Sequence, residues 1–167
     1  MQTLLLGLGN PILTDDGVGI RAAEAVRAAL PPGAPVTVGE ACVGGLGLME
    51  RLVGYRRAIL IDAICTGDAP PGAVRRLTLD DLRTITPPRH TASTHDAPLL
   101  TALETGRQMG LPLPDDIVLF AIEAANVSDF GETLTPPVAA AIPEVVQRVL
   151  TELATRNPQP ATLNFEL

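Results

Sequence analysis

Residues 3–19, TLLLGLGNPILTDDGVG, contain the pattern on which the predicted fold depends. Residues 4–8 form an apolar run of strand length, and from residue 16 to residue 30 the apolar side chains recur at helical spacing. The turn-forming sequence Gly9-Asn10-Pro11 lies between these two segments. A strand that leads through a tight turn into an amphipathic helix is typical of βαβ units, and it indicates an α/β protein with a parallel sheet.

The rest of the chain continues this alternation of short apolar runs and helical segments. Residues 58–61 are apolar at consecutive positions, like residues 4–8, so we expect both strands to be central and covered on both faces of the sheet. Three further strands are predicted at residues 36–40, 73–79 and 117–122. The loose apolar pattern of residues 73–79 favours a position at the edge of the sheet.

Helices are predicted over residues 16–30, 44–53 and 98–109 and over a final amphipathic segment at residues 142–153. Pro143 is expected in the first turn of the last helix or at a kink. Together these elements predict a three-layer α/β/α sandwich with a mostly parallel, twisted sheet of about five strands. We expect a single domain at residues 1–155, followed by a flexible tail at residues 156–167.

The composition excludes several classes of function. The chain of 167 residues carries a formal net charge of −7, and its twelve basic residues are all arginine. Such an acidic chain lacks the clustered positive charge with which proteins bind nucleic acid. Without lysine, neither a Schiff base nor a Walker-type phosphate site is possible. Cys42 and Cys65 lie far apart in the sequence, so we expect free, buried thiols rather than a disulfide or a thiolate zinc site.

The N-terminal residues show no pattern of a secretory signal peptide. No apolar run approaches the ~18 residues that a membrane-spanning helix needs. We therefore expect a cytoplasmic protein without a membrane span.

The opening motif shares its first two glycines, Gly7 and Gly9, with the fingerprint of dinucleotide-binding proteins. Ile12, however, stands where that fingerprint requires a third glycine. Pro11 also removes a backbone N–H where a pyrophosphate needs a donor. The motif therefore indicates a tight turn that leads out of a central strand, not a nucleotide site.

Three residues at the ends of predicted strands or at the starts of predicted helices are candidate metal ligands, namely Asp16, Asp62 and His95. The carboxyl ends of parallel strands border one crevice, so we expect these three side chains to converge there. Two carboxylates and one imidazole suit a divalent transition metal. His90 lies in a polar loop and is not expected to take part.

Each of these residues also has an ordinary structural interpretation. One of the pair Asp15 and Asp16 is expected to cap the helix that follows. Asp62 can instead cap the loop through Thr66 and Gly67, and a single histidine is more often structural than a ligand. The residues alone leave both interpretations open.

Three motifs resemble, in their order and spacing, those of the hydrogenase maturation endopeptidases: residues 6–19, then Ile61-Asp62-Ala63, then Thr94-His95. The resemblance extends from residue 3 to about residue 153, and Leu134-Thr135-Pro136 is similar to the C-terminal region of the family. The first motif is the most specific of these. Many family members have Glu at the position of Asp16, and residues 40–45, EACVGG, replace a stretch that is commonly similar to Asp-Gly-Gly-Thr.

This resemblance implies an endopeptidase that removes the C-terminal extension from the precursor large subunit of a NiFe hydrogenase after nickel insertion. Asp16, Asp62 and His95 are then the catalytic residues that also recognise the nickel, and the nickel is supplied by the substrate rather than permanently bound. Activation of the peptide carbonyl or of a water by the metal and general-base catalysis by a carboxylate both remain open. We expect the enzyme to be a monomer.

Two other functions remain as alternatives. The first is a non-catalytic nickel-binding accessory protein for hydrogenase assembly. The second is an enzyme similar to peptidyl-tRNA hydrolases, which also begin with a strand followed by Gly-Leu-Gly-Asn-Pro. That family requires glycine in place of Ile12 and a Thr-Arg-His-Asn stretch, and this chain has neither.

Overall fold

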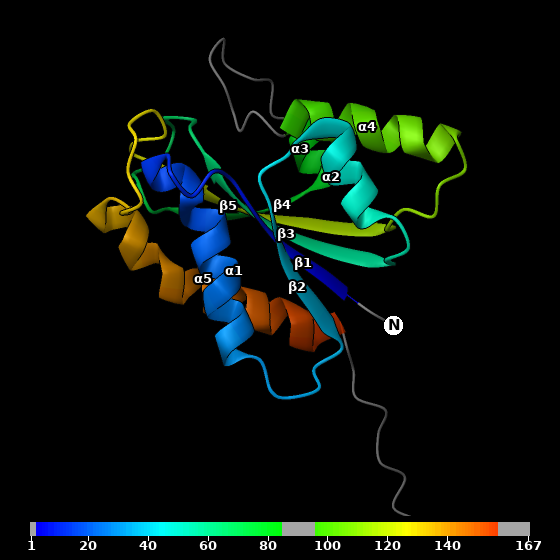
Figure 1. Cartoon of the computed structure of the whole chain (residues 1–167), viewed down its shortest axis with the longest axis horizontal. Coiled ribbons are helices and arrows are strands. Elements are labelled where there is room, and N and C mark those ends of the chain that lie inside the picture. Colours follow the sequence, from blue (N-terminus) through cyan, green and yellow to red (C-terminus); the bar gives the residue numbers. More distant parts are fainter. Residues whose placement is uncertain (1–2, 85–95, 157–167) are drawn as a thin grey trace, which may run out of the picture.

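The computed structural model describes residues 3–84 and 96–156, which fold around one five-stranded sheet (Figure 1). The strands are β1 (Thr3–Leu8), β2 (Val36–Ala41), β3 (Arg57–Ile64), β4 (Val74–Thr78) and β5 (Asp116–Glu123). They lie in the order β2-β1-β3-β5-β4, and all neighbours are parallel except β4, which runs antiparallel to β5. The mostly parallel sheet and the edge position of the fourth strand were both predicted and are confirmed.

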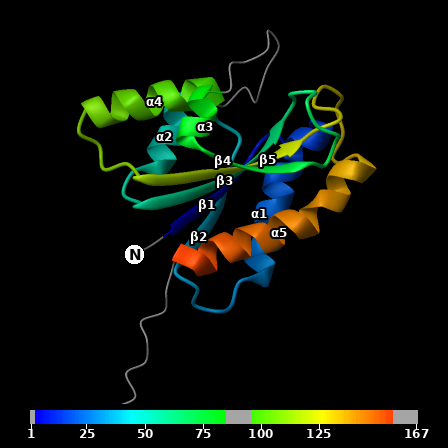
Figure 2. The same cartoon turned by 180° about the vertical axis from the view of Figure 1, so that it is seen from behind.

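The helices form one layer on each side of this sheet, as the two opposite views show (Figures 1 and 2). One face is covered by α1 (Val18–Ala29) and α5 (Pro136–Arg156), and the other by α2 (Gly45–Leu52), α3 (Leu79–Thr84) and α4 (Asp96–Gln108). A short 3-10 helix, η1 (Thr14–Gly17), connects β1 to α1. The predicted three-layer α/β/α sandwich is therefore confirmed.

The central strands β1 and β3 are buried at every position. Alternate residues contribute to two aliphatic clusters: Leu5 and Ile59 face α1 and α5, whereas Leu6 and Leu60 face α2 and α4. Full burial of one such side chain contributes about 1.5–3 kcal/mol to folding. This burial explains the apolar runs from which the central strands were predicted. A strand with helices on both faces has no side that favours polar residues.

Two glycines allow the start of α1 to approach the ends of the strands. A Cβ atom on Gly19, in the first turn of α1, would overlap the carbonyl oxygens of Leu8 and Ile61. Gly9 has φ +123°, a conformation that favours glycine, and its Cβ would overlap the carbonyl of Asp16. The sequence between β1 and α1 thus places η1 directly over the carboxyl ends of β1 and β3.

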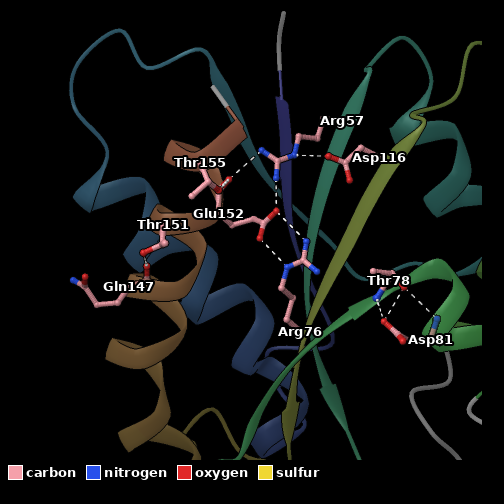
Figure 3. Close-up of polar contacts among 9 residues, drawn as sticks. All are labelled: Arg57, Arg76, Thr78, Asp81, Asp116, Gln147, Thr151, Glu152 and Thr155. Atoms are coloured by element: carbon pink, nitrogen blue, oxygen red, sulfur yellow. Dashed lines mark hydrogen bonds and ion pairs between the residues drawn. The ribbon is translucent and has the colours of Figure 1, made fainter. Parts of the chain in front are cut away.

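A network of charged side chains fixes α5 to the sheet (Figure 3). Arg57 Nη2 donates a hydrogen bond to Glu152 Oε1 at 2.5 Å, and Arg76 Nε donates to Glu152 Oε2 at 2.7 Å. Arg57 Nε also lies 3.0 Å from Asp116 Oδ2. Arg57 and Asp116 begin β3 and β5, so part of this network lies at the amino edge of the parallel strands.

Some local details differ from the predictions. Pro143 lies in the interior of α5, which begins at Pro136, so the first turn is excluded as its position and a kink at Pro143 stays a prediction. Helix α3 was not predicted, although Thr78 and Asp81 form a capping box at its start. The N–H of Thr78 donates to Asp81 Oδ2 at 2.7 Å, and the N–H of Asp81 donates to Thr78 Oγ1 at 3.2 Å. The spacing Thr-x-x-Asp was the signal in the sequence.

Cys42 and Cys65 are free thiols, as predicted, but Cys42 is exposed and Cys65 is half-buried, so the expectation that both are buried was wrong. Within the described part of the chain, no helix is both long and apolar enough to cross a membrane. The predicted tail begins at Arg156, the last residue of α5, and its other residues, 157–167, lie outside the described residues.

Candidate functional site

The order of the strands places the topological switch point of the sheet between β1 and β3. The chain passes from β1 to β2 on one side and then returns to β3 on the other side of β1. Connections that leave two adjacent parallel strands in opposite directions open a crevice at their carboxyl ends, where ligands of open α/β sheets bind. By this rule the ligand-binding position of this chain is at the carboxyl ends of β1 and β3.

Asp16 and Asp62 both lie at this edge. Asp16 is part of η1, directly after β1, and its Oδ2 accepts a hydrogen bond from the N–H of Asn10 at 2.7 Å. Asp62 is a residue of β3 itself, which continues to Ile64, so it does not follow the strand as its apolar run suggested. Its side chain is buried, and its Oδ1 accepts a hydrogen bond from the N–H of Ala63 at 2.9 Å.

The third predicted ligand, His95, lies outside the described residues, as does His90. The convergence of Asp16, Asp62 and His95 therefore stays a prediction. Among residues 3–84 and 96–156, no group of three His, Cys, Asp or Glu side chains is arranged to hold a metal ion.

Asp15 has a structural role that differs from that of Asp16. Its carboxylate is fully buried. Asp15 Oδ2 accepts hydrogen bonds from the N–H groups of Ala125 and Asn126, at 3.0 and 2.9 Å. Thr135 donates its N–H to Oδ1 at 2.7 Å and its hydroxyl to Oδ2 at 2.8 Å. Asp15 thus joins the segment after β1 to the loop after β5 and to the start of α5.

Neither aspartate caps a helix, which was the predicted role of one of them. No side chain forms a capping hydrogen bond at the start of η1 or of α1. The sequence contained no local sign of the actual role of Asp15, because its partners lie 110 to 120 residues away along the chain.

Glu123, which was not among the predicted site residues, organises the loop after β3. It is buried at the end of β5 and accepts hydrogen bonds from the N–H groups of Thr66 and Gly67, at 2.7 and 2.8 Å. Arg75 Nη2 lies 3.0 Å from its Oε2. The loop amides that Asp62 was alternatively expected to cap are therefore bound by Glu123. An acidic residue at the end of the apolar run 117–122 was the available signal.

The half-buried thiol of Cys65 reports on the negative charge at this edge. Its pKa is raised above the ordinary value, first by burial and then by the nearby carboxylates of Glu123, Asp16, Asp15 and Asp62. Two of these are the predicted ligands, Asp16 in η1 and Asp62 in β3. The edge therefore combines carboxylate oxygens, which have the chemistry of metal ligands and of general bases, with a thiol whose raised pKa favours its protonated form at neutral pH.

Comparisons with known proteins identify the family to which this chain is similar. A family model described as hydrogenase maturation protease matches residues 16–152. The hydrogenase expression/formation protein HupD of Bradyrhizobium diazoefficiens is 32% identical over 143 residues, covering 82% of this chain and 70% of the relative. The hydrogenase 2 maturation protease of Escherichia coli is 28% identical over 155 residues, covering 92% and 91% of the two chains.

A solved structure extends the similarity to three dimensions. The hydrogenase maturating endopeptidase HybD from Escherichia coli superimposes with a TM-score of 0.74 at 26% sequence identity, over 94% of each chain. The segment that the family model matches, residues 16–152, includes Asp16, Asp62 and His95. This chain belongs to the hydrogenase maturation protease family.

Proposed function

We propose that this protein removes the C-terminal extension from the precursor large subunit of a NiFe hydrogenase, and that it does so only after nickel has been inserted. In this proposal Asp16, Asp62 and His95 recognise the nickel that the substrate carries. The observation that carries the proposal is the position of Asp16 and Asp62 at the carboxyl ends of β1 and β3, the topological switch point of the sheet.

The chemistry of the two carboxylates supports a role in recognition. Carboxylate oxygens and an imidazole nitrogen are donors that divalent transition metals accept. A set of two carboxylates and one imidazole without thiolates is also sparse. We therefore expect the enzyme to retain little nickel once its product has left.

The carboxylates also offer a reason why the cleavage is selective. Binding of the substrate's nickel to Asp16 and Asp62 would fix the scissile peptide bond against this edge, and such positioning accounts for a large part of many enzymatic rates. A carboxylate here also has the chemistry of a general base toward water. A large subunit without nickel lacks the group that this contact requires.

The proposal is tested by incubating the purified protein with a matched precursor large subunit in nickel-loaded and nickel-free forms. Loss of the C-terminal extension is followed by mass spectrometry of the intact subunit. We expect cleavage of the nickel-loaded form alone and no cleavage of an unfolded peptide that contains the same junction. Equal cleavage of both forms would contradict nickel recognition, and nickel-dependent binding without cleavage would indicate an accessory protein instead.

The two histidines provide a matched comparison for the third ligand. His95→Ala is expected to abolish processing, whereas His90→Ala is expected to process at the wild-type rate. The chain contains no other histidine, so the two variants together test every imidazole side chain. Normal processing by His95→Ala would remove His95 from the site.

A further inference from the structure

The exposed apolar side chains of the described residues are distributed unevenly over the molecule. Five large ones are exposed, and four of them, Ile12, Val43, Leu46 and Phe130, lie in or directly after the segments that follow β1, β2 and β5. These segments belong to the carboxyl edge of the sheet, where Asp16 and Asp62 lie. The fifth, Met109, follows α4 and precedes β5, so it lies toward the opposite edge. Clusters of exposed apolar residues commonly mark sites of protein contact.

Phe130 is the most exposed of the five, with 85% of its surface accessible, yet the loop around it is tightly held. Asn126 Oδ1 accepts hydrogen bonds from the N–H groups of Ser128 and Asp129, at 3.0 and 3.1 Å. On the other side, the carbonyl of Gly131 accepts from the N–H of Thr14 at 2.7 Å. A rigid loop that presents an exposed aromatic ring has already lost the conformational entropy that binding would otherwise cost.

Ile12 lies beside this loop. The N–H of Gly131, next to Phe130, donates to the carbonyl of Ile12 at 3.0 Å, and Leu13 forms an isolated parallel bridge with Gly131. Asp16 follows Ile12 within the same segment, and the N–H of Asp16 donates to the carbonyl of Leu13. The apolar pair of Ile12 and Phe130 is thus attached to the element that carries Asp16.

Val43 and Leu46 lie on the other side of the same switch point. They follow β2, whereas Phe130 follows β5, and the sheet places β1 and β3 between these two strands. The carboxyl ends of β1 and β3, with Asp16 and Asp62, therefore have exposed apolar side chains on both sides. A protein bound across these strand ends would meet both groups.

Two of the segments that carry these side chains are acidic. Residues 9–17 and 124–135 contain aspartate or glutamate and no arginine, and residues 41–46 carry no charged side chain. Asp129 and Glu132, on either side of Phe130, are both exposed. This arrangement is complementary to an apolar depression that is bordered by arginine or lysine side chains, because opposite charges favour the correct orientation of the two proteins.

We propose that Phe130, with Ile12 beside it, is the anchor by which this enzyme docks its protein substrate, and that it fits an apolar depression with a basic border on the folded large-subunit precursor. The inference rests on the proposed function, since it names that precursor as the occupant. It adds a determinant of specificity that is separate from nickel recognition. An aromatic side chain that inserts into a pocket is a frequent centre of binding energy in protein interfaces.

The test compares Phe130→Ser with Met109→Ser in processing of the nickel-loaded precursor. Both residues are highly exposed, at 85% and 70%, so both variants are expected to fold with wild-type melting temperatures. We expect Phe130→Ser to raise KM at least about tenfold with little change in kcat, because the anchor is used in binding. Phe130→Leu should restore part of the loss, and Met109→Ser should behave like the wild type.

Several results would overturn the docking role. One is an unchanged kcat/KM for Phe130→Ser, and another is an equal loss for Met109→Ser. Dimerisation of the wild type that Phe130→Ser abolishes would assign the surface to a second copy of the chain. A wild-type protein that binds the precursor without cutting it would contradict the proposed function alone, and loss of that binding in Phe130→Ser would still support the anchor.

Discussion

Thr135 binds both carboxylate oxygens of Asp15, with its N–H 2.7 Å from Oδ1 and its hydroxyl oxygen 2.8 Å from Oδ2. This contact joins two segments that are 120 residues apart in the sequence. Since Thr135 directly precedes α5, the bond also fixes the start of the last helix. Two adjacent aspartates at one edge of the sheet therefore have different partners: Asp15 joins distant segments, whereas Asp16 accepts the N–H of Asn10 and is the proposed ligand of the substrate's nickel.

The first prediction concerns this structural role. Both oxygens of Asp15 accept backbone N–H groups, so in Asp15→Asn the amide NH2 faces at least one N–H in either orientation. We therefore expect this substitution to lower the free energy of unfolding by about 2–4 kcal/mol. Urea unfolding measures this change. The adjacent substitution Asp16→Asn is the control, and we expect it to lose processing with a much smaller loss of stability. Equal stability losses in the two variants would contradict the division of roles.

The coupling between Asp15 and Thr135 can be measured separately. Thr135→Val removes only the hydroxyl donor and retains the backbone bond to Oδ1. If the hydroxyl acts through Asp15, the two substitutions Asp15→Asn and Thr135→Val should not be additive. The double variant should then lose about 0.5–2 kcal/mol less free energy of unfolding than the sum of the two single losses. Simple additivity in urea unfolding would show that the hydroxyl bond contributes nothing specific.

A further prediction separates function from stability at Asp62. Asp62→Ala is expected to abolish processing while the melting temperature stays nearly unchanged or rises, because the desolvation of a buried carboxylate offsets the hydrogen bonds that it makes. Asp68, an exposed carboxylate in the loop after β3, provides the control, and Asp68→Ala should leave processing intact. Normal processing by Asp62→Ala would refute its role as a ligand, and unfolding of this variant would favour a structural role.

The two thiols are predicted to differ in reactivity. The pKa of Cys65 is raised, chiefly by burial, so at neutral pH less of it is present as the reactive thiolate, whereas Cys42 is exposed. We expect iodoacetamide to modify Cys42 first, as measured by peptide mass spectrometry, and the modification of Cys65 to accelerate as the pH rises. The variant Cys65→Ser should retain the fast modification, which we assign to Cys42. A Cys65 that reacts as fast as Cys42 at pH 7 would contradict the prediction.

The capping box of α3 predicts a change of stability in acid. The hydrogen bond from the N–H of Thr78 is the main cause that lowers the pKa of Asp81 below its usual range, and the hydroxyl of Thr78 adds to it. A carboxyl whose pKa is lowered by folding stabilises the protein above its unfolded pKa of about 3.9. This contribution is lost as the pH falls through the lower folded pKa. We therefore expect the melting temperatures of the wild type and Asp81→Asn to differ at pH 6 and to converge near pH 2, and a constant difference would contradict the assignment.

The main features of the fold were predictable because they depend on local periodicity. Apolar runs at residues 4–8 and 58–61 correspond to strands that helices cover on both faces, and the stripe at residues 142–153 lies within α5. Helix α3 was missed because six residues are too few for a helical period to appear. Pro143 is not in the first turn because α5 extends further towards the N-terminus than its amphipathic stripe indicates.

The candidate site was predictable only in part, for a physical reason. The placement of Asp16 and Asp62 follows from the order of strands and turns, which a single sequence can indicate. The roles of Asp15 and Glu123 depend on backbone N–H groups that distant segments bring to them. A backbone N–H is not tied to any residue type, because every residue except proline carries one. No sequence motif therefore indicates which N–H groups will act as donors.

The long-range bonds of Asp15 also set a time at which the site can form. Synthesis proceeds from the N-terminus, so β1, η1 and Asp16 leave the ribosome long before residues 125–135 exist. Until Ala125, Asn126 and Thr135 have emerged, the buried carboxylate of Asp15 lacks the donors that it has in the folded protein. A nascent chain therefore lacks the bonds that join the segment after β1 to the start of α5 until nearly the whole chain has been translated.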